Sequence, residues 1–291
     1  MKVLNISNVS YGLDSKAILN NIHFSISSNE KVALLGNNGS GKSTLIDLIV
    51  GNIRSTRGSA TVFQKPFSKS KNRVGILYDN TPFFPVLKVG EIISFVQTAY
   101  GKDKTDTTVQ RLNELLGISK LENSLFYSLS RGERKKVGII VSMIHSPELL
   151  IADEPTSFLD PSTRSKYWKI ISEKEHLTVL FTTHLWDEAQ KYADKIVFIN
   201  EGIQLDYENT VASLLSDKYL PGSTKIVVEG DSLINQELPD ATIITYNDQH
   251  HIFSLDIDNV LNFIKKSVHN YSLLKKSLED VYQYLIVNPI R

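Results

Sequence analysis

The stretch that decides the fold is residues 36–43, which read GNNGSGKS. They follow a short apolar run, KVALL at residues 31–35, and precede a helical pattern, STLIDLIVG at residues 43–51. A glycine-rich loop between a strand and a helix is the context that a phosphate-binding P-loop requires. Glycines let successive N–H groups turn toward phosphate oxygens, and the helix adds the positive end of its dipole. The sequence therefore predicts a P-loop nucleotide site, and a glycine-rich turn that matches by chance is the alternative.

The P-loop combines a backbone cradle with side chains that have chemical roles. We expect the Lys42 ammonium to pair with the β- and γ-phosphates and the Ser43 hydroxyl to ligate Mg²⁺. The cofactors expected for this site are therefore ATP and Mg²⁺. The candidate nucleotide-binding residues of this segment are Gly36, Asn37, Asn38, Gly39, Ser40, Gly41, Lys42, Ser43 and Thr44.

A second apolar run ends in two acids, LLIADE at residues 149–154. A strand that emerges beside the P-loop brings Asp153 to the Mg²⁺ shell, directly or through water. Glu154, one residue further, is then placed to act as general base on the attacking water. Alone, such an ending is typical of any strand followed by a turn, here at Pro155. Together with the P-loop it predicts ATP hydrolysis.

The pentapeptide LSRGE at residues 129–133 resembles the Leu-Ser-Gly-Gly-Gln signature motif of the ATP-binding cassette (ABC) family, with Arg131 and Glu133 as departures. Ser130 and the Gly132 N–H stand at the start of a predicted helix, and a helix N-terminus suits a γ-phosphate. In the family this motif faces the nucleotide held by the other subunit. The alternative is an ordinary serine N-cap with Glu133 as its capping-box partner.

Three further features support the resemblance. Residues 157–160, SFLD, resemble the D-loop that crosses the family's dimer interface, so Asp160 becomes a candidate nucleotide contact. His184, after a predicted strand at residues 178–181, resembles the switch histidine that senses the γ-phosphate, which makes it catalytic beside Glu154 and Lys42. Tyr11 occupies the place of the family's adenine-stacking aromatic, with core packing as its alternative.

One position departs from the family pattern. The Q-loop glutamine is expected near the end of a strand at residues 74–77, where this chain has Asp79. An aspartate is able to ligate Mg²⁺ or its water, so Asp79 is a candidate metal ligand, although an alignment shift of one residue stays open. Phe83, Phe84 and Pro85 follow, where the family docks its permease; packing inside the protein is the alternative.

Length and pattern define the expected architecture. With 291 residues, the chain accommodates one large domain of about 200 residues and a small second one. We predict an α/β P-loop cassette with an antiparallel β subdomain, a mixed or parallel core sheet, and a helical subdomain at about residues 83–147. The cassette would span residues 1–220. Residues 221–291, with strand patterns KIVVEG, ATIITY and HIFSLD and two helical patterns, would form a small α+β domain.

Composition limits the partners. The 32 basic and 32 acidic residues give zero formal net charge, so no nucleic-acid partner is expected. No stretch approaches the roughly 18 apolar residues of a membrane span, and residues 1–12 lack the apolar core of a signal peptide. We therefore expect a cytoplasmic protein, peripheral on the inner face of the membrane. The pair His250 and His251 lacks ligand-spaced partners, which favours a solvated turn over a metal site.

The resemblance implies an ATPase that works as a homodimer, or as a heterodimer with a second cassette, and drives an integral-membrane permease. Residues 278–282, LEDVY, are similar to the Leu-Glu-Asp-Val-Phe element of export-type bacterial cassettes for drugs, peptides or polysaccharides. A capped amphipathic helix would carry the same letters for packing reasons. An importer ATPase and a non-transport regulatory ATPase remain alternatives. The segment between residues 43 and 129 lacks the sustained heptads of a DNA-acting cassette protein.

Overall fold

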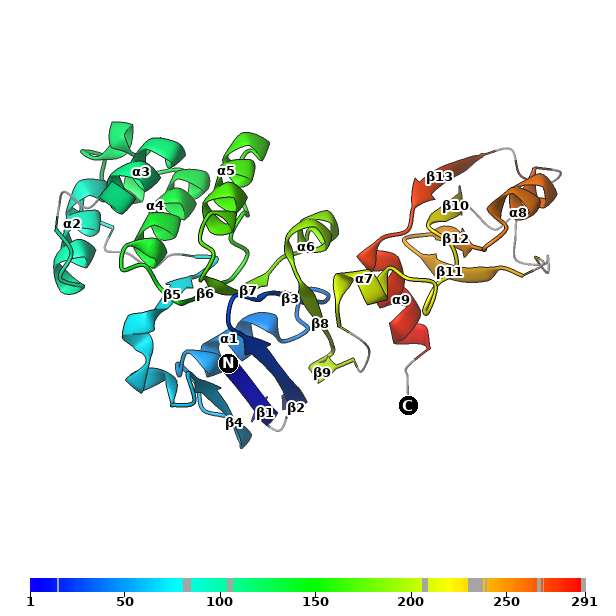
Figure 1. Ribbon diagram of the computed structural model, residues 1–291, viewed down its shortest axis with the longest axis horizontal. Helices are drawn as coiled ribbons and strands as arrows, with labels where there is room; N and C mark the ends of the chain where they lie inside the picture. The colour runs from blue at the N-terminus through cyan, green and yellow to red at the C-terminus, as the bar shows by residue number, and fades with distance from the viewer. Residues whose placement is uncertain are drawn as a thin grey trace.

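The computed structural model describes residues 1–14, 16–80, 85–103, 107–205, 209–229, 238, 240–265, 268 and 270–288, which fold around two β-sheets. Figure 1 shows the larger sheet in the middle of the molecule, a group of helices on one side of it and a smaller sheet at the opposite end. The α/β class predicted from the sequence is confirmed.

The larger sheet has the strand order β4-β1-β2-β9-β8-β3-β7-β6-β5. Strands β1, β2 and β4 pair antiparallel, whereas β3 and β5 to β8 pair in parallel. The short strand β9 pairs with both β2 and β8, so it merges the two parts that the sequence predicts into one sheet. The strands are β1 (Lys2–Leu13), β2 (Lys16–Ser27), β3 (Lys31–Leu35), β4 (Arg57–Val62), β5 (Val74–Leu77), β6 (Leu149–Ala152), β7 (Thr178–Thr182), β8 (Lys195–Asn200) and β9 (Ile203–Gln204).

Helices cover both faces of the parallel strands. Val32 and Leu34 of β3 join an apolar cluster with α1, whereas Ala33 and Leu35 join a cluster with α4 and α5. Burial on both faces explains why the run KVALL is apolar throughout. Helices α2 to α4 fall within the helical segment that the sequence predicts. The helices are α1 (Lys42–Ile49), α2 (Val89–Ala99), α3 (Thr107–Leu116), α4 (Arg131–Met143), α5 (Pro161–Ser172), α6 (Trp186–Tyr192) and α7 (Val211–Leu214), with 3₁₀ turns at Phe67–Lys69, Lys71–Arg73, Ser119–Leu121 and Phe126–Ser128.

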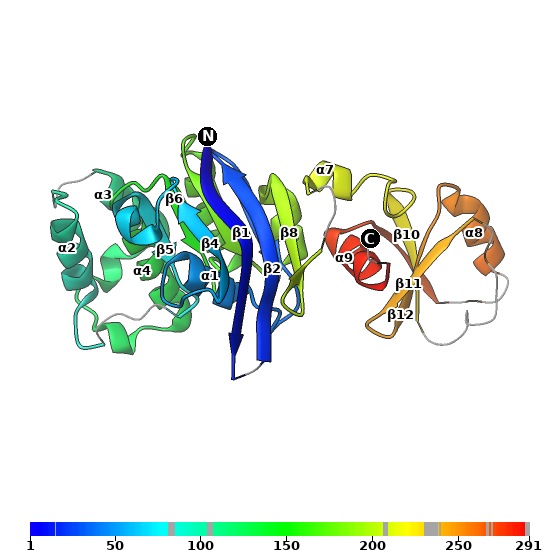
Figure 2. The same cartoon turned by 90° about the horizontal axis from the view of Figure 1, so that it is seen from below.

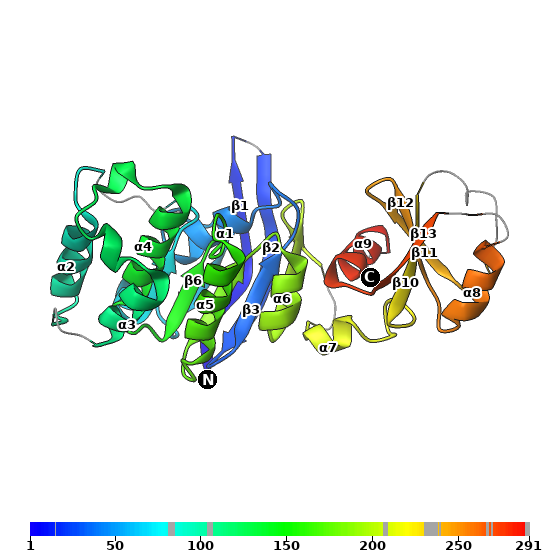
Figure 3. The ribbon, with the colours of Figure 1, turned by 90° about the horizontal axis from the view of Figure 1, so that it is seen from above.

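The smaller sheet is antiparallel, with the order β11-β12-β10-β13. Its strands are β10 (Thr224–Glu229), β11 (Thr242–Tyr246), β12 (Gln249–Phe253) and β13 (Tyr271–Lys275), and its helices are α8 (Ile257–Ile264) and α9 (Leu278–Val287). Figures 2 and 3 show α9 between this sheet and β8, and α8 at the far end of the molecule. The strand patterns did not include β13, because this edge strand is largely exposed and its burial does not alternate.

The apolar core does not stop where the second sheet begins. Phe253 of β12 and Val281 of α9 belong to the same buried cluster as Phe198 of β8. The division into a cassette at residues 1–220 and an accessory domain at residues 221–291 therefore stays a prediction.

The expectation of a solvated turn at His250 and His251 is wrong, because both residues lie in strand β12. Alternation along a strand sends the two side chains to opposite faces. His251 is only 4% exposed, stacks on the Tyr246 ring with centroids 3.8 Å apart, and places Nδ1 3.6 Å from the Asp280 carboxylate. Local polarity suggested a turn, but the strand pairing buries this histidine against α9.

The buried His251 predicts acid sensitivity. Burial, together with the nearby Lys225 charge, lowers the pKa of His251 to about 4, against about 6.5 in an unfolded chain. The unfolded state therefore binds more protons between these values. The contribution of His251 to the free energy of unfolding is fully present above about pH 6.5 and is lost as the pH falls toward 4. The slope from this group is up to about 1.4 kcal/mol per pH unit.

His251→Phe keeps the ring stack and removes the titrating group, so the free energy of unfolding should fall less steeply with acid than in the wild type. Urea unfolding at a series of pH values between 4 and 7 measures this slope. His250→Phe, on the opposite face of β12, is the matched control. Identical slopes for His251→Phe and the wild type would contradict the prediction.

Candidate functional site

The P-loop lies between β3 and α1, as the sequence predicts, and its path depends on glycine. Gly36 has φ 151° and Gly41 has φ 105°, both in the region that side chains rarely adopt. A Cβ at Gly36 would collide with the Ile199 carbonyl of β8, and one at Gly41 would come within 2.7 Å of the Leu19 side chain. The neighbouring strands therefore leave room for the loop only without side chains at these positions.

Lys42, the first residue of α1, folds back over the loop. Its ammonium donates to the Gly36 carbonyl at 2.8 Å and to the Asn37 carbonyl at 2.9 Å. Burial lowers the pKa of Lys42, while the negative charges of Glu154 and Asp153 oppose that shift. The loop, its lysine and the two acids that follow β6 thus form one cluster of charged groups.

The acid pair is held by a threonine that the sequence analysis did not single out. Thr182, at the end of β7, donates its hydroxyl to Asp153 Oδ1 at 2.6 Å and accepts the Glu154 N–H at 2.9 Å. The parallel neighbours β6 and β7 end at the same edge, so the residues that follow them meet there. A hydroxyl residue two positions before His184, at the end of the strand that follows the acid strand, was the available sequence clue.

Glu154 and His184 form a close polar pair on the exposed side of the site. The His184 Nδ1 lies 2.8 Å from Glu154 Oε2, with the imidazole side chain 59% exposed and the carboxylate 20% exposed. Glu154 has φ 48°, a left-handed conformation that costs about 1–3 kcal/mol in a non-glycine residue and that clusters at functional sites. The backbone turn brings the carboxylate to the imidazole, and the pair is able to orient and deprotonate a water molecule.

The capping box considered for the signature segment is present. Ser130 caps α4 and donates its hydroxyl to Glu133 Oε2 at 2.7 Å, while its backbone N–H donates to the same oxygen at 2.8 Å. Gly132 packs on the D-loop segment, where a Cβ would lie 2.6 Å from the Phe158 carbonyl oxygen. Within the described residues, no hydrogen bond or ion pair joins Ser130 or Gly132 to the P-loop.

Sequence comparison identifies the family. A model of the family described as ABC transporter matches residues 19–157. A putative ABC transporter ATP-binding protein of Archaeoglobus fulgidus is 33% identical over 209 residues, which cover 69% of this chain and 87% of that protein. The chain belongs to the ABC transporter family. As an ABC subunit it is an ATP-binding protein and an ATPase.

Two further comparisons relate this ABC subunit to a named transport protein and to a solved structure. The lantibiotic transport ATP-binding protein SrtF of Streptococcus pyogenes is 31% identical over 203 residues, 69% of this chain and 88% of that protein. A solved structure of the ATP-binding subunit of an ABC transporter superposes with a TM-score of 0.67 at 24% identity, covering 73% of this chain and 92% of that one. The fold of the cassette is thus shared.

Two candidate nucleotide contacts of the ABC subunit have other partners. Asp160 caps α5, because its carboxylate accepts the Thr163 N–H at 3.0 Å and the Thr163 hydroxyl at 2.6 Å, bonds that lower the pKa of Asp160. Tyr11 lies in β1 opposite Leu19 and is half-buried against the apolar cluster around α1, as its packing alternative predicts. Nucleotide contacts of Asp160 and Tyr11 stay predictions.

Asp79 lies against a buried lysine that the sequence analysis missed. Its Oδ1 accepts from Lys135 Nζ at 3.1 Å and from the Ser157 hydroxyl at 2.9 Å. Burial lowers the pKa of Lys135, and Asp79 opposes that shift. Asp79 therefore already has a cationic partner, and its role as a metal ligand stays a prediction. Phe83 and Phe84, suggested for permease docking, lie outside the described residues.

The donors at the P-loop suit Mg²⁺. Mg²⁺ is usually bound by one or two carboxylates together with substrate phosphates and water, rather than by a protein cage. Ser43, exposed at the first turn of α1, and Asp153, at the end of β6, offer such a partial set. Among the residues that the structure describes, there is no group of three or more His, Asp or Glu side chains that could hold a metal ion. No helix in these ranges has the length and apolar character to cross a bilayer.

Proposed function

We propose that this ABC ATPase powers export through a separate integral-membrane permease, with a drug, peptide or polysaccharide as cargo. The similarity to SrtF, whose name describes lantibiotic transport, supports a transport role with a peptide cargo over a regulatory one. The resemblance of residues 278–282, LEDVY, to an export-type element supports export over import. The intact cluster of Lys42, Asp153, Glu154 and His184 supports a catalytic rather than a purely regulatory subunit. In this proposal the subunit is peripheral on the inner face of the membrane.

The hydrolytic site would work through residues already in contact. The P-loop amides and Lys42 bind the phosphates, the lysine exchanging its loop carbonyls for phosphate oxygens. Ser43 and Asp153 would hold Mg²⁺, which supplies positive charge to the phosphates when bound. Glu154 takes the proton of the attacking water on its free carboxylate oxygen, while His184 holds the other oxygen.

The signature and D-loop residues would act across a dimer. The N-terminus of α4, with Ser130 and Gly132, faces the nucleotide of the second copy in this proposal, and Asp160 lies beside it. The Gly132–Phe158 contact supports a shared surface, since it fixes the two segments to each other. Tyr11 would contact adenine, and a homodimer is the default.

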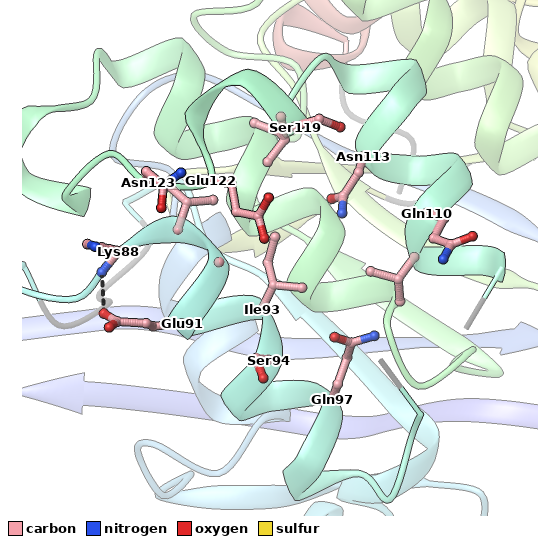
Figure 4. A pocket seen from close by; sticks show the side chains of 14 residues that line it. Lys88, Glu91, Ile93, Ser94, Gln97, Gln110, Asn113, Ser119, Glu122 and Asn123 are labelled. Atoms are coloured by element: carbon pink, nitrogen blue, oxygen red, sulfur yellow. Dashed lines mark hydrogen bonds between the residues drawn. The ribbon is translucent and has the colours of Figure 1, made fainter. Parts of the chain in front are cut away.

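A polar pocket next to α2 supports permease docking. It has a volume of about 640 Å³ and opens between α2 and α3, as Figure 4 shows. Lys88 and Gln97 lie on one side of it, Asn113 and Glu122 on the other. The first lining residue in the chain is Lys88, three residues after the segment at residues 83–85 where the family resemblance places the permease. We propose that it receives a cytoplasmic segment of that permease.

Affinity purification of the tagged subunit in mild detergent tests the proposal. A multi-spanning membrane protein should copurify with the wild type and be lost from Glu122→Lys, which reverses a charge inside the pocket. Glu114→Lys, an exposed change on α3 outside the pocket, should retain it. Recovery of only ribosomes or DNA would contradict the transport proposal. Inverted vesicles that contain the complex should take up cargo on ATP addition if the direction is export.

A further inference from the structure

Helix α9 reaches the nucleotide site of the cassette through one side chain. Tyr282 is fully buried, and its ring packs between Trp186 of α6 and Phe198 of β8, with centroids 5.2 Å from each. Figure 1 shows α9 lying between β8 and the smaller sheet. Helix α9 therefore packs against β8 and α6 through this side chain.

The Tyr282 hydroxyl lies where the P-loop meets the end of β8. It accepts the Asn37 N–H at 3.4 Å and donates toward Asn200 Oδ1 at 3.3 Å, with the Ile199 carbonyl at 3.5 Å. The carbonyl of the same residue, Asn37, accepts from Lys42. One P-loop residue thus connects the catalytic lysine to helix α9.

The same helix also borders the switch histidine. Ser277 and Glu279, at the start of α9, line a pocket of about 500 Å³ together with His184, and α5 and α6 form its other walls. Trp186, which packs on Tyr282, stands two residues after His184. Helix α9 thus contacts the P-loop through Tyr282 and lines a pocket together with the switch histidine.

We propose that Tyr282 is a positioning residue for ATP binding, and that its hydroxyl fixes the Asn37 peptide in the shape that the phosphates require. Gly36 lies so close to the Ile199 carbonyl of β8 that a Cβ would collide with it, so the loop cannot shift toward β8. Asn37 itself is exposed, and the hydroxyl of Tyr282 links its backbone N–H to α9. Burial raises the pKa of Tyr282, so the hydroxyl keeps its proton and remains a donor to Asn200.

Tyr282→Phe in the full chain tests this role, because it removes the hydroxyl and keeps the packed ring. The long hydrogen bond between the Asn37 N–H and the Tyr282 hydroxyl should contribute only weakly to ATP binding. KM for ATP should therefore rise about threefold while kcat changes less than about twofold. Titration with a fluorescent ATP analogue should give the same rise in Kd. Tyr284→Phe, a half-buried tyrosine two residues further along α9, is the matched control and should change neither value.

Asn200→Ala tests the role of the Tyr282 hydroxyl independently, because it removes the acceptor of that hydroxyl. If Asn200 orients the hydroxyl, its loss should raise KM as Tyr282→Phe does, and the double variant should add little to either single one. An unchanged or lower KM for Tyr282→Phe would overturn the proposal. So would a fall in thermal stability without a change in KM, because that result assigns the hydroxyl to folding alone. Neither outcome bears on the proposed transport function.

Discussion

Glu154→Gln is expected to leave ATP binding intact and to reduce ATP turnover by a factor of at least about 100. The amide has the size of the carboxylate and retains an oxygen or nitrogen to pair with the His184 imidazole, so the local packing should persist. It cannot accept the proton of the attacking water. ATP then persists, and size-exclusion chromatography with ATP and Mg²⁺ should show a dimer that the wild type does not accumulate.

The control for this prediction is Glu173→Gln, which removes a carboxylate at the end of α5 that pairs with Arg111. Phosphate release by this variant should match the wild type. A Glu154→Gln subunit that stays monomeric with ATP, or that retains turnover within about tenfold of the wild type, would contradict the general-base assignment.

Asp280→Ala is expected to cause the largest loss of stability, about 3–5 kcal/mol, because it leaves a buried charge unpaired. Asp280 is completely buried, and its Oδ1 accepts from Lys225 Nζ and from the Tyr246 hydroxyl, each at 2.6 Å. Its Oδ2 accepts the backbone N–H and the hydroxyl of Ser277, which caps α9. Removal of this carboxylate strands the Lys225 ammonium, which is itself only 6% exposed.

Urea unfolding followed by circular dichroism measures this loss. Glu279→Gln, the neighbouring acid that lines a pocket instead of the core, should cost less than about 1 kcal/mol. Adding Lys225→Met to Asp280→Ala should recover part of the stability, because it removes the stranded charge. A cost below about 1 kcal/mol for Asp280→Ala would show that the buried pair does not anchor α9 to the smaller sheet.

The sequence by itself predicted the hydrolytic site and the fold class, and the fold class is confirmed. The P-loop at residues 36–43 and the acids that follow β6 are read from local patterns of strand, loop and helix, whereas His184 after β7 was singled out by the resemblance to the ABC family. Parallel strands end at a common edge, so residues placed just after such strands meet in space without knowledge of the details. This geometry is why the Glu154–His184 contact was foreseeable.

Only the tertiary structure decided which polar groups support that machinery. Thr182 on the acid pair and Lys135 on Asp79 join positions far apart in the chain, and no local period encodes such pairings. The LEDVY segment at residues 278–282 shows most clearly what the sequence alone left open. Its letters fit an export element and a capped helix equally well, and in the fold its Leu, Asp, Val and Tyr are all buried. The contact of Tyr282 with Asn37 exists because packing of the smaller sheet carries α9 back to the P-loop.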